Sequence, residues 1–170
     1  MEKITEQLSV LPINFFKKGD LLDQEGPILS HFVGGNGRDY YWVDVDEDYN
    51  RWMVFEITHN GLQNFFEKKS SLRDLVTLCP SGYVYYIDID DNIDFKRFFQ
   101  SDLDSIPTSY LPSEKSFYNE RHYEKYADIM KRRLKEEVVR QKMPDYLISS
   151  NTAFLPKPHR RIEKVARIHK

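Results

Sequence analysis

Residues 26–57, GPILSHFVGGNGRDYYWVDVDEDYNRWMVFEI, decide the fold class of this chain, because they predict three consecutive antiparallel strands. The first strand covers residues 28–33. Residues 34–37, Gly-Gly-Asn-Gly, then supply the positive φ angles of a hairpin, for which Asn-Gly is the strongest short-range signal. The second and third strands cover residues 40–45 and 51–57.

The second and third strands alternate with a period of two, as strands with one buried face do. Each therefore has two predicted faces. These are Tyr41, Val43 and Val45 against Tyr40, Trp42 and Asp44 in the second strand, and Trp52, Val54 and Glu56 against Met53, Phe55 and Ile57 in the third.

After residue 57 the pattern changes to short helices and one further strand. Thr58 or Asn60 can cap a helix that carries Leu62, Phe65 and Phe66, and Ser71-Leu72-Arg73-Asp74 resembles the capping box of a second short helix. Residues 83–89 are rich in β-forming side chains and predict a fourth strand. Asp94 then caps a brief helix with Phe95, Phe98 and Phe99 at helical spacing.

The predicted fold is therefore α+β, with an antiparallel meander of about four strands on which short helices pack, within an acidic domain of residues 1–110. Residues 101–113, with their two prolines, predict a linker. A long amphipathic helix follows within residues 111–143, at roughly 114–142, and residues 144–170 form a basic tail. The apolar stripe of that helix is Tyr123, Ala127, Met130, Leu134 and Val138.

Charge divides the chain into an acidic body and a basic arm. Residues 1–110 hold 10 Lys and Arg against 19 Asp and Glu, a net charge of -9, whereas residues 111–170 hold 15 against 8, a net charge of +7. Such a division favours an arm that seeks an external anion, or two halves that neutralise each other within the fold or between subunits. We expect self-complementation or a protein partner ahead of nucleic acid.

The single cysteine, Cys79, excludes an internal disulfide and suits a reducing compartment. It is expected to be a buried apolar residue rather than a reactive thiol. Residues 1–10 are too charged for a signal peptide, and no apolar run reaches the roughly 18 residues of a membrane span. We therefore expect a cytoplasmic protein without a membrane segment.

Two pairs of aspartates are the best candidates for a metal site. Asp44 and Asp46 alternate at the end of the second strand, and Asp88 and Asp90 at the end of the fourth, so adjoining strand ends would hold a hard cation. Neither pair begins a calcium-binding loop, because the glycine and the final carboxylate are missing. Charges that keep the strand ends solvated are the preferred explanation, and we expect no metal and no cofactor.

No catalytic residue is predicted, because the five histidines have no ligand spacing and none pairs with Cys79 or with a serine in a nucleophile elbow. The residues expected to bind a partner are the cations of the long helix and the tail, together with a predicted aromatic patch on the outer face of the sheet. They are Lys131, Arg132, Arg133, Lys135, Arg160, Arg161, Lys164 and Arg167, and Tyr40, Trp42 and Tyr86.

Several short motifs resemble a family of small uncharacterised bacterial proteins that is known only as a domain of unknown function. The motifs lie within about residues 21–90. They are Gly26-Pro27-Ile28-Leu29, Tyr40-Tyr41-Trp42-Val43-Asp44, Arg51-Trp52 and Ser71-Leu72-Arg73-Asp74-Leu75. The resemblance implies a bacterial origin and an α+β core, and it carries over no catalytic residue.

Three functions are compatible with these observations. The leading hypothesis is a non-enzymatic interaction or regulatory module whose basic arm docks onto a protein partner or a second copy. The second is a nucleic-acid-associated accessory protein of a bacterial defence or toxin-control system. The third is a metal-dependent enzyme built on Asp44, Asp46, Asp88 and Asp90.

Overall fold

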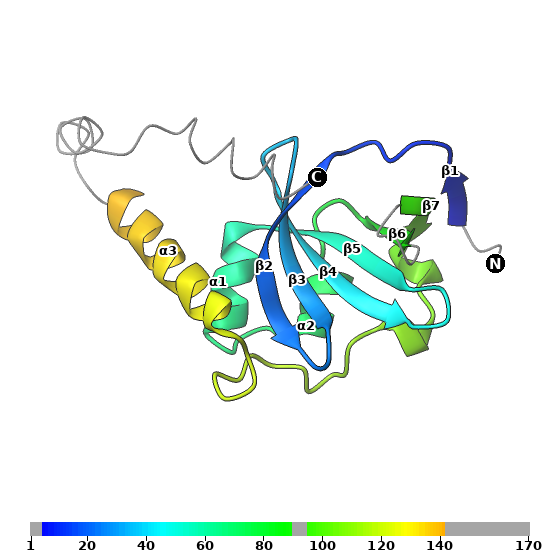
Figure 1. Ribbon diagram of the computed structural model, residues 1–170. Helices are drawn as coiled ribbons and strands as arrows, with labels where there is room; N and C mark the ends of the chain where they lie inside the picture. Colours follow the sequence, from blue (N-terminus) through cyan, green and yellow to red (C-terminus); the bar gives the residue numbers. More distant parts are fainter. Residues whose placement is uncertain (1–4, 90–94, 142–170) are drawn as a thin grey trace.

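The computed structural model describes residues 5–89 and 95–141, which form a seven-stranded antiparallel sheet with three α-helices (Figure 1). Two short 3₁₀ turns, Leu103–Ser105 and Thr108–Tyr110, precede the last helix. The elements in chain order are β1 (Thr5–Leu8), β2 (Phe15–Asp23), β3 (Pro27–Gly34), β4 (Asp39–Asp46), β5 (Arg51–Ile57), α1 (His59–Phe66), α2 (Leu72–Thr77), β6 (Tyr83–Ile89), β7 (Phe95–Asp102) and α3 (Lys125–Gln141).

The strand order is β1-β7-β6-β5-β4-β3-β2, so β2 to β7 form a meander and β1 adds to β7 at the far edge. The prediction of about four strands is therefore wrong. β2 was not predicted because its sequence, FFKKGDLLD, does not alternate with a period of two. This strand pairs with β3 with several shifts in register. β7 replaces the predicted helix after Asp94, because Phe98 and Phe99 lie on opposite faces of the sheet and not on one helical stripe.

Both faces of the sheet are covered by apolar side chains. On one face, Phe15 lies in a group that we call the aromatic cluster, with Tyr40, Trp42, Trp52, Val54, Tyr85 and Ile87. The other face packs against the three helices, and we call it the helix-covered core. Its members include Tyr41, Met53, Phe55, Leu62, Phe65, Leu72, Val76, Tyr86, Ala127 and Met130.

The aromatic cluster is enclosed because the sheet is strongly coiled. The ring of Phe15 in β2 lies 6.5 Å from that of Tyr85 in β6, although three strands lie between β2 and β6. In a flat sheet four strand spacings would separate these backbones by about 19 Å. The coil therefore brings the inner faces of distant strands together.

The predicted faces of β4 and β5 are confirmed, but both faces are buried. Tyr40 is 5% exposed, Trp42 2% and Tyr86 3%, and Tyr86 belongs to the helix-covered core whereas the other two belong to the aromatic cluster. The predicted exposed aromatic patch is therefore wrong. Its residues have no surface with which to dock, because the coiled sheet encloses Tyr40 and Trp42 and the helix-covered core encloses Tyr86.

The predicted turn at Gly37 and the predicted caps of α1 and α2 are confirmed, whereas Asp94, the predicted cap of a third helix, lies outside the described residues. Gly37 takes a φ of 80°, and its amide donates to the carbonyl of Gly34 at 2.9 Å, which closes the hairpin between β3 and β4. Thr58 caps α1 by accepting the amide of Gly61 at 2.9 Å. Ser71 and Asp74 form the predicted capping box of α2.

The predicted linker, residues 101–113, is part of the fold, because residues 101 and 102 end β7 and the two 3₁₀ turns follow. Ile106 and Tyr118 are buried in the helix-covered core, and α3 begins at Lys125 and not at residue 114. Ala127 and Met130 of the predicted stripe are buried, and Val138 lies beyond the described side chains. Because residues 118–130 complete the same core, the contacts favour one folding unit over a separate domain of residues 1–110.

Candidate interaction surface on the C-terminal helix

The N-terminal half of α3 is fastened to the sheet. The amide of Glu124 donates to the carbonyl of Leu21 at 2.9 Å, so the helix begins beside β2. The ring of Tyr126 lies on the backbone of Gly19, where a Cβ atom would come within 2.5 Å of the ring. Ala127 and Met130 complete the attachment, and the other side of α3 remains in solvent.

The exposed side of α3 carries the cations that the sequence singled out. Arg132, Arg133 and Lys135 are exposed, and none of them has an ion pair to another residue that the structure describes. Lys131 differs, because its Nζ lies 5.0 Å from the ring centre of Tyr118 and 3.9 Å from Glu120 Oε1. We use the name basic face of α3 for Arg132, Arg133 and Lys135, which share the exposed side of the helix with Asp128 and Glu136. The predicted Arg160, Arg161, Lys164 and Arg167 lie outside the described residues.

Five polar side chains join α3 to the rest of the fold, and we call them the histidine clasp. Asp39 lies at the centre, with Oδ1 2.7 Å from His31 Nε2 and Oδ2 3.5 Å from His59 Nε2. His31 Nδ1 lies 2.7 Å from the hydroxyl of Tyr126, and His59 Nδ1 lies 2.7 Å from Glu137 Oε2. The clasp therefore reaches α3 at two places, three helical turns apart.

The two halves of the clasp differ in exposure. The side chain of His31 is 8% exposed and its ring stacks on that of Tyr126, whereas the side chain of His59 is 59% exposed. Burial raises the pKa of Tyr126, which opposes the use of its phenol as a nucleophile at neutral pH. The geometry therefore suits attachment of α3 better than covalent chemistry.

A second polar cluster lies at the other end of the sheet, around Arg51 of β5. Its guanidinium donates to both carboxylate oxygens of Asp88, from Nε at 2.6 Å and from Nη2 at 3.0 Å, and Arg97 Nη2 lies 3.0 Å from Asp88 Oδ2. Tyr110 donates to Asp46 Oδ2 at 2.9 Å. This arginine cluster pairs each of its carboxylates with a donor.

The acidic strand ends therefore do not combine into one site. β5 lies between β4 and β6, so Arg51 separates Asp46 from Asp88. A register shift separates Asp44 from Asp46 and pairs Asp44 with Trp52, on the face of the aromatic cluster. Burial, with the charge of Glu47 second, raises the pKa of Asp44. Asp90 lies outside the described residues. In residues 5–89 and 95–141, no group of three or more His, Cys, Asp or Glu side chains could hold a metal ion.

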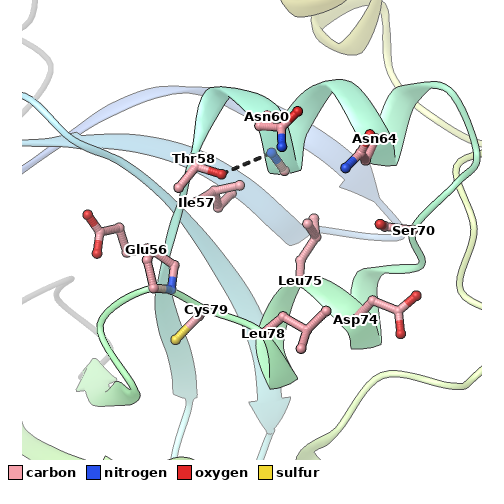
Figure 2. A pocket seen from close by; sticks show the side chains of 12 residues that line it. Glu56, Ile57, Thr58, Asn60, Asn64, Ser70, Asp74, Leu75, Leu78 and Cys79 are labelled. Carbon is pink, nitrogen blue, oxygen red and sulfur yellow. Dashed lines mark hydrogen bonds between the residues drawn. The ribbon is translucent and has the colours of Figure 1, made fainter.

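A shallow pocket of about 150 Å³ lies between α1 and α2 (Figure 2). Cys79 is buried at its edge, with Sγ 3.4 Å from the carbonyl oxygen of Tyr83. The polar groups of Thr58 and Asp74 in its wall already cap the two helices. The lining residues include no histidine beside the thiol, so the pocket is explained by the packing of two capped helices.

Sequence reasoning missed the histidine clasp. Tyr126 lies 95 residues from His31, and no local pattern joins them. One signal was present: the predicted hairpin brings residues just before and after its turn together, and in the structure Asp39 pairs with Val33, diagonally across from His31 on the same face. The hairpin could have identified the first pair of the clasp, but not its partners from α1 and α3.

Comparisons of the chain with protein-family models, with curated proteins and with solved structures find no match. The resemblance to a bacterial family of unknown function therefore stays a prediction. None of the described helices is long and apolar enough to cross a membrane.

Proposed function

We propose that the protein is a non-enzymatic, cytoplasmic interaction module whose C-terminal helix docks onto an acidic protein surface. The observation that carries the proposal is the basic face of α3, where three exposed cations have no ion pair to a described residue. The same helix is fixed by Ala127 and Met130 in the helix-covered core. A fixed helix loses little conformational entropy on docking, so its charges are available for a partner at low cost.

A second copy of the chain is a suitable partner, because this molecule itself has an acidic surface for the basic face of α3. Glu47 and Asp48 are exposed in the turn between β4 and β5, at the end of the sheet remote from α3 (Figure 1). One copy therefore cannot place its basic face on its own acidic turn. Two copies can do so head to tail, and the division of charge along the chain, -9 against +7, favours that arrangement.

Nucleic acid is the alternative partner, because the same cations can contact phosphates. The acidic body opposes the approach of a polyanion, which is why protein is preferred. A second copy of the chain and nucleic acid can be distinguished by two measurements. These are self-association at low and high salt, and binding of labelled DNA and RNA.

The test is sedimentation of the full chain at about 50 mM and about 500 mM salt, where charge screening differs strongly. We expect self-association at low salt that Arg132→Ala/Lys135→Ala weakens by about tenfold. The matched control is Lys115→Ala/Arg121→Ala, which removes two exposed cations from the loop before α3 and should leave association unchanged.

Fluorescence anisotropy with labelled single-stranded and duplex DNA and RNA supplies the contrasting result. An affinity of about 1 µM or tighter near physiological salt, with a steep salt dependence, would establish the nucleic-acid alternative. A chain that stays monomeric at both salt concentrations would remove the second copy as partner.

A further inference from the structure

β1 lies apart from the strand that follows it in the chain. β2 to β7 form a meander, whereas β1 lies beside β7, at the opposite edge of the sheet from β2. Residues 9–14, which we call the strap, join β1 to β2 (Figure 1). The strap therefore has to cross the width of the sheet, which no hairpin turn of the meander does.

The strap is short for this distance. In a flat sheet six strand spacings would separate β1 from β2 by about 29 Å. The chain from Leu8 to Phe15 spans at most about 25 Å, even when it is fully extended. β1 can therefore pair with β7 of its own chain only because the sheet coils and brings its two edges together.

Main-chain pairing with β7 holds β1 in place. This pairing covers the four residues Thr5–Leu8. The side chains of Glu6 and Gln7 are exposed, whereas that of Leu8 packs on the aromatic cluster. A segment with so few buried side chains separates from a fold at a lower free energy than global unfolding requires. β1 can therefore leave β7 while the rest of the core stays packed.

The strap is loosely packed in its first half. Leu11 and Ile13 contact the aromatic cluster, whereas the side chain of Val10 is 73% exposed. A cavity of about 360 Å³ lies beside the strap and is also lined by Phe15 and Phe98. The second half of the strap is therefore anchored next to β2, and the first half can change direction with little loss of packing.

We propose that two copies of the chain exchange β1, so that the strand of each copy pairs with β7 of the other. The segment that fits the edge of β7 is seen in the structure, because β1 itself occupies that edge in register. An exchanged strand makes the same contacts as before, and a short connection favours exchange because the strand no longer has to reach its own edge. Exchange uses main-chain hydrogen bonds and not charge, so it is independent of the proposed docking of α3.

The test is disulfide capture between Glu6→Cys and Gln100→Cys, whose positions lie opposite each other in the pairing of β1 with β7. Residues directly opposite lie within the Cα separation that a disulfide requires. Both full-length variants also carry Cys79→Ala, which leaves each with one thiol. They are mixed at high concentration, incubated, diluted and oxidised, and we expect a covalent heterodimer on a non-reducing gel. The matched control pairs Glu6→Cys with Lys115→Cys, an exposed position before α3, and should give about tenfold less heterodimer.

A protein that carries Glu6→Cys and Gln100→Cys in one chain checks the pairing itself. In dilute solution it should form the disulfide within a monomer. If it does so, and the mixture gives no heterodimer above the control, the exchange is refuted. If it forms no disulfide, the pairing on which the exchange depends is wrong.

Two further measurements separate exchange from other forms of association. The yield of heterodimer should be equal at about 50 mM and about 500 mM salt, and a yield that falls at high salt would assign the complex to docking of α3 instead. A Gly-Ser-Gly-Ser insertion after Val10 lengthens the strap, so we expect it to lower the yield by about fivefold. An unchanged yield would contradict the role given to the strap. Loss of α3 docking alone would leave the exchange standing.

Discussion

At the scale of single residues, Arg51 combines three kinds of interaction. It forms the two-pronged hydrogen bond to Asp88, it lies 5.0 Å from the ring centres of Tyr49 and Phe99, and it is half-buried at the end of β5. Hydrogen bonding to Asp88 raises the pKa of Arg51, so the guanidinium remains charged under all folding conditions. Removal of either partner would leave the other charge without its counterion, which destabilises the folded state.

Asp88→Asn should therefore be strongly destabilising. The carboxylate is 4% exposed, and its removal leaves Arg51 and Arg97 without their shared counterion. We expect the free energy of unfolding to fall by about 2 to 3 kcal/mol, less than for a fully buried pair because part of Arg51 remains in solvent.

Urea denaturation measures this change, and Asp48→Asn in the exposed turn supplies the control, with an expected change within about 0.5 kcal/mol. Equal effects of the two substitutions would show that the arginine cluster contributes no more than an ordinary surface charge.

At the scale of elements, the contact between α3 and β2 depends on the absence of a side chain. Gly19 has an ordinary φ, so the conformation of β2 does not require glycine at this position. The close approach of the Tyr126 ring does require it. The contact positions Tyr126 for its hydrogen bond to His31, and thus sets the place of the helix along the sheet.

Gly19→Ala should lower the free energy of unfolding by about 1 to 3 kcal/mol, because the added methyl group overlaps the Tyr126 ring and α3 must shift. Gly35→Ala is the matched control, since a Cβ there meets its nearest neighbour at 3.7 Å.

Thermal melting compares the two variants, and hydrogen exchange of α3 amides reports whether the helix loosens first. If Gly19→Ala were as stable as Gly35→Ala, α3 could shift along the sheet with no loss in the free energy of unfolding, and the prediction would be wrong.

At the scale of the whole molecule, tyrosines fill both sides of the sheet. Tyr41 and Tyr86 lie in the helix-covered core, and Tyr40 and Tyr85 lie in the aromatic cluster. Burial raises the pKa of all four. An unfolded chain ionises its tyrosines near pH 10, so these side chains favour the folded state below that pH and destabilise it progressively above.

We therefore expect cooperative alkaline unfolding. Ultraviolet titration of tyrosinate should show the buried tyrosines ionising above pH 10, in a step that coincides with loss of the circular dichroism of the fold. Ionisation of all the tyrosines in a single step near pH 10, with the dichroism unchanged, would contradict the burial described above.

The parts of the fold that the sequence predicts are those fixed by neighbours along the chain. The hairpin at Gly37, the alternation in β5 and the capping box at Ser71 each depend on residues a few positions apart. β7 escaped prediction because the spacing of Phe95, Phe98 and Phe99 fits a helix as well as a strand, and only pairing with β6 decides between them. The basic face of α3 was predictable from charge, whereas its attachment through His31 required contacts across the whole chain.

The pairing of β1 with β7 has a consequence for synthesis on the ribosome. Thr5 lies opposite Ser101, so β1 has no neighbour in the sheet until about a hundred further residues have been translated. Tyr118, Ala127 and Met130, which complete the helix-covered core, leave the ribosome later still. A nascent chain halted before Ser101 exposes β1 and the edge of β6 to other polypeptides. Translational pausing within β7 would therefore promote aggregation, and a chaperone that holds the first strand until release would suppress it.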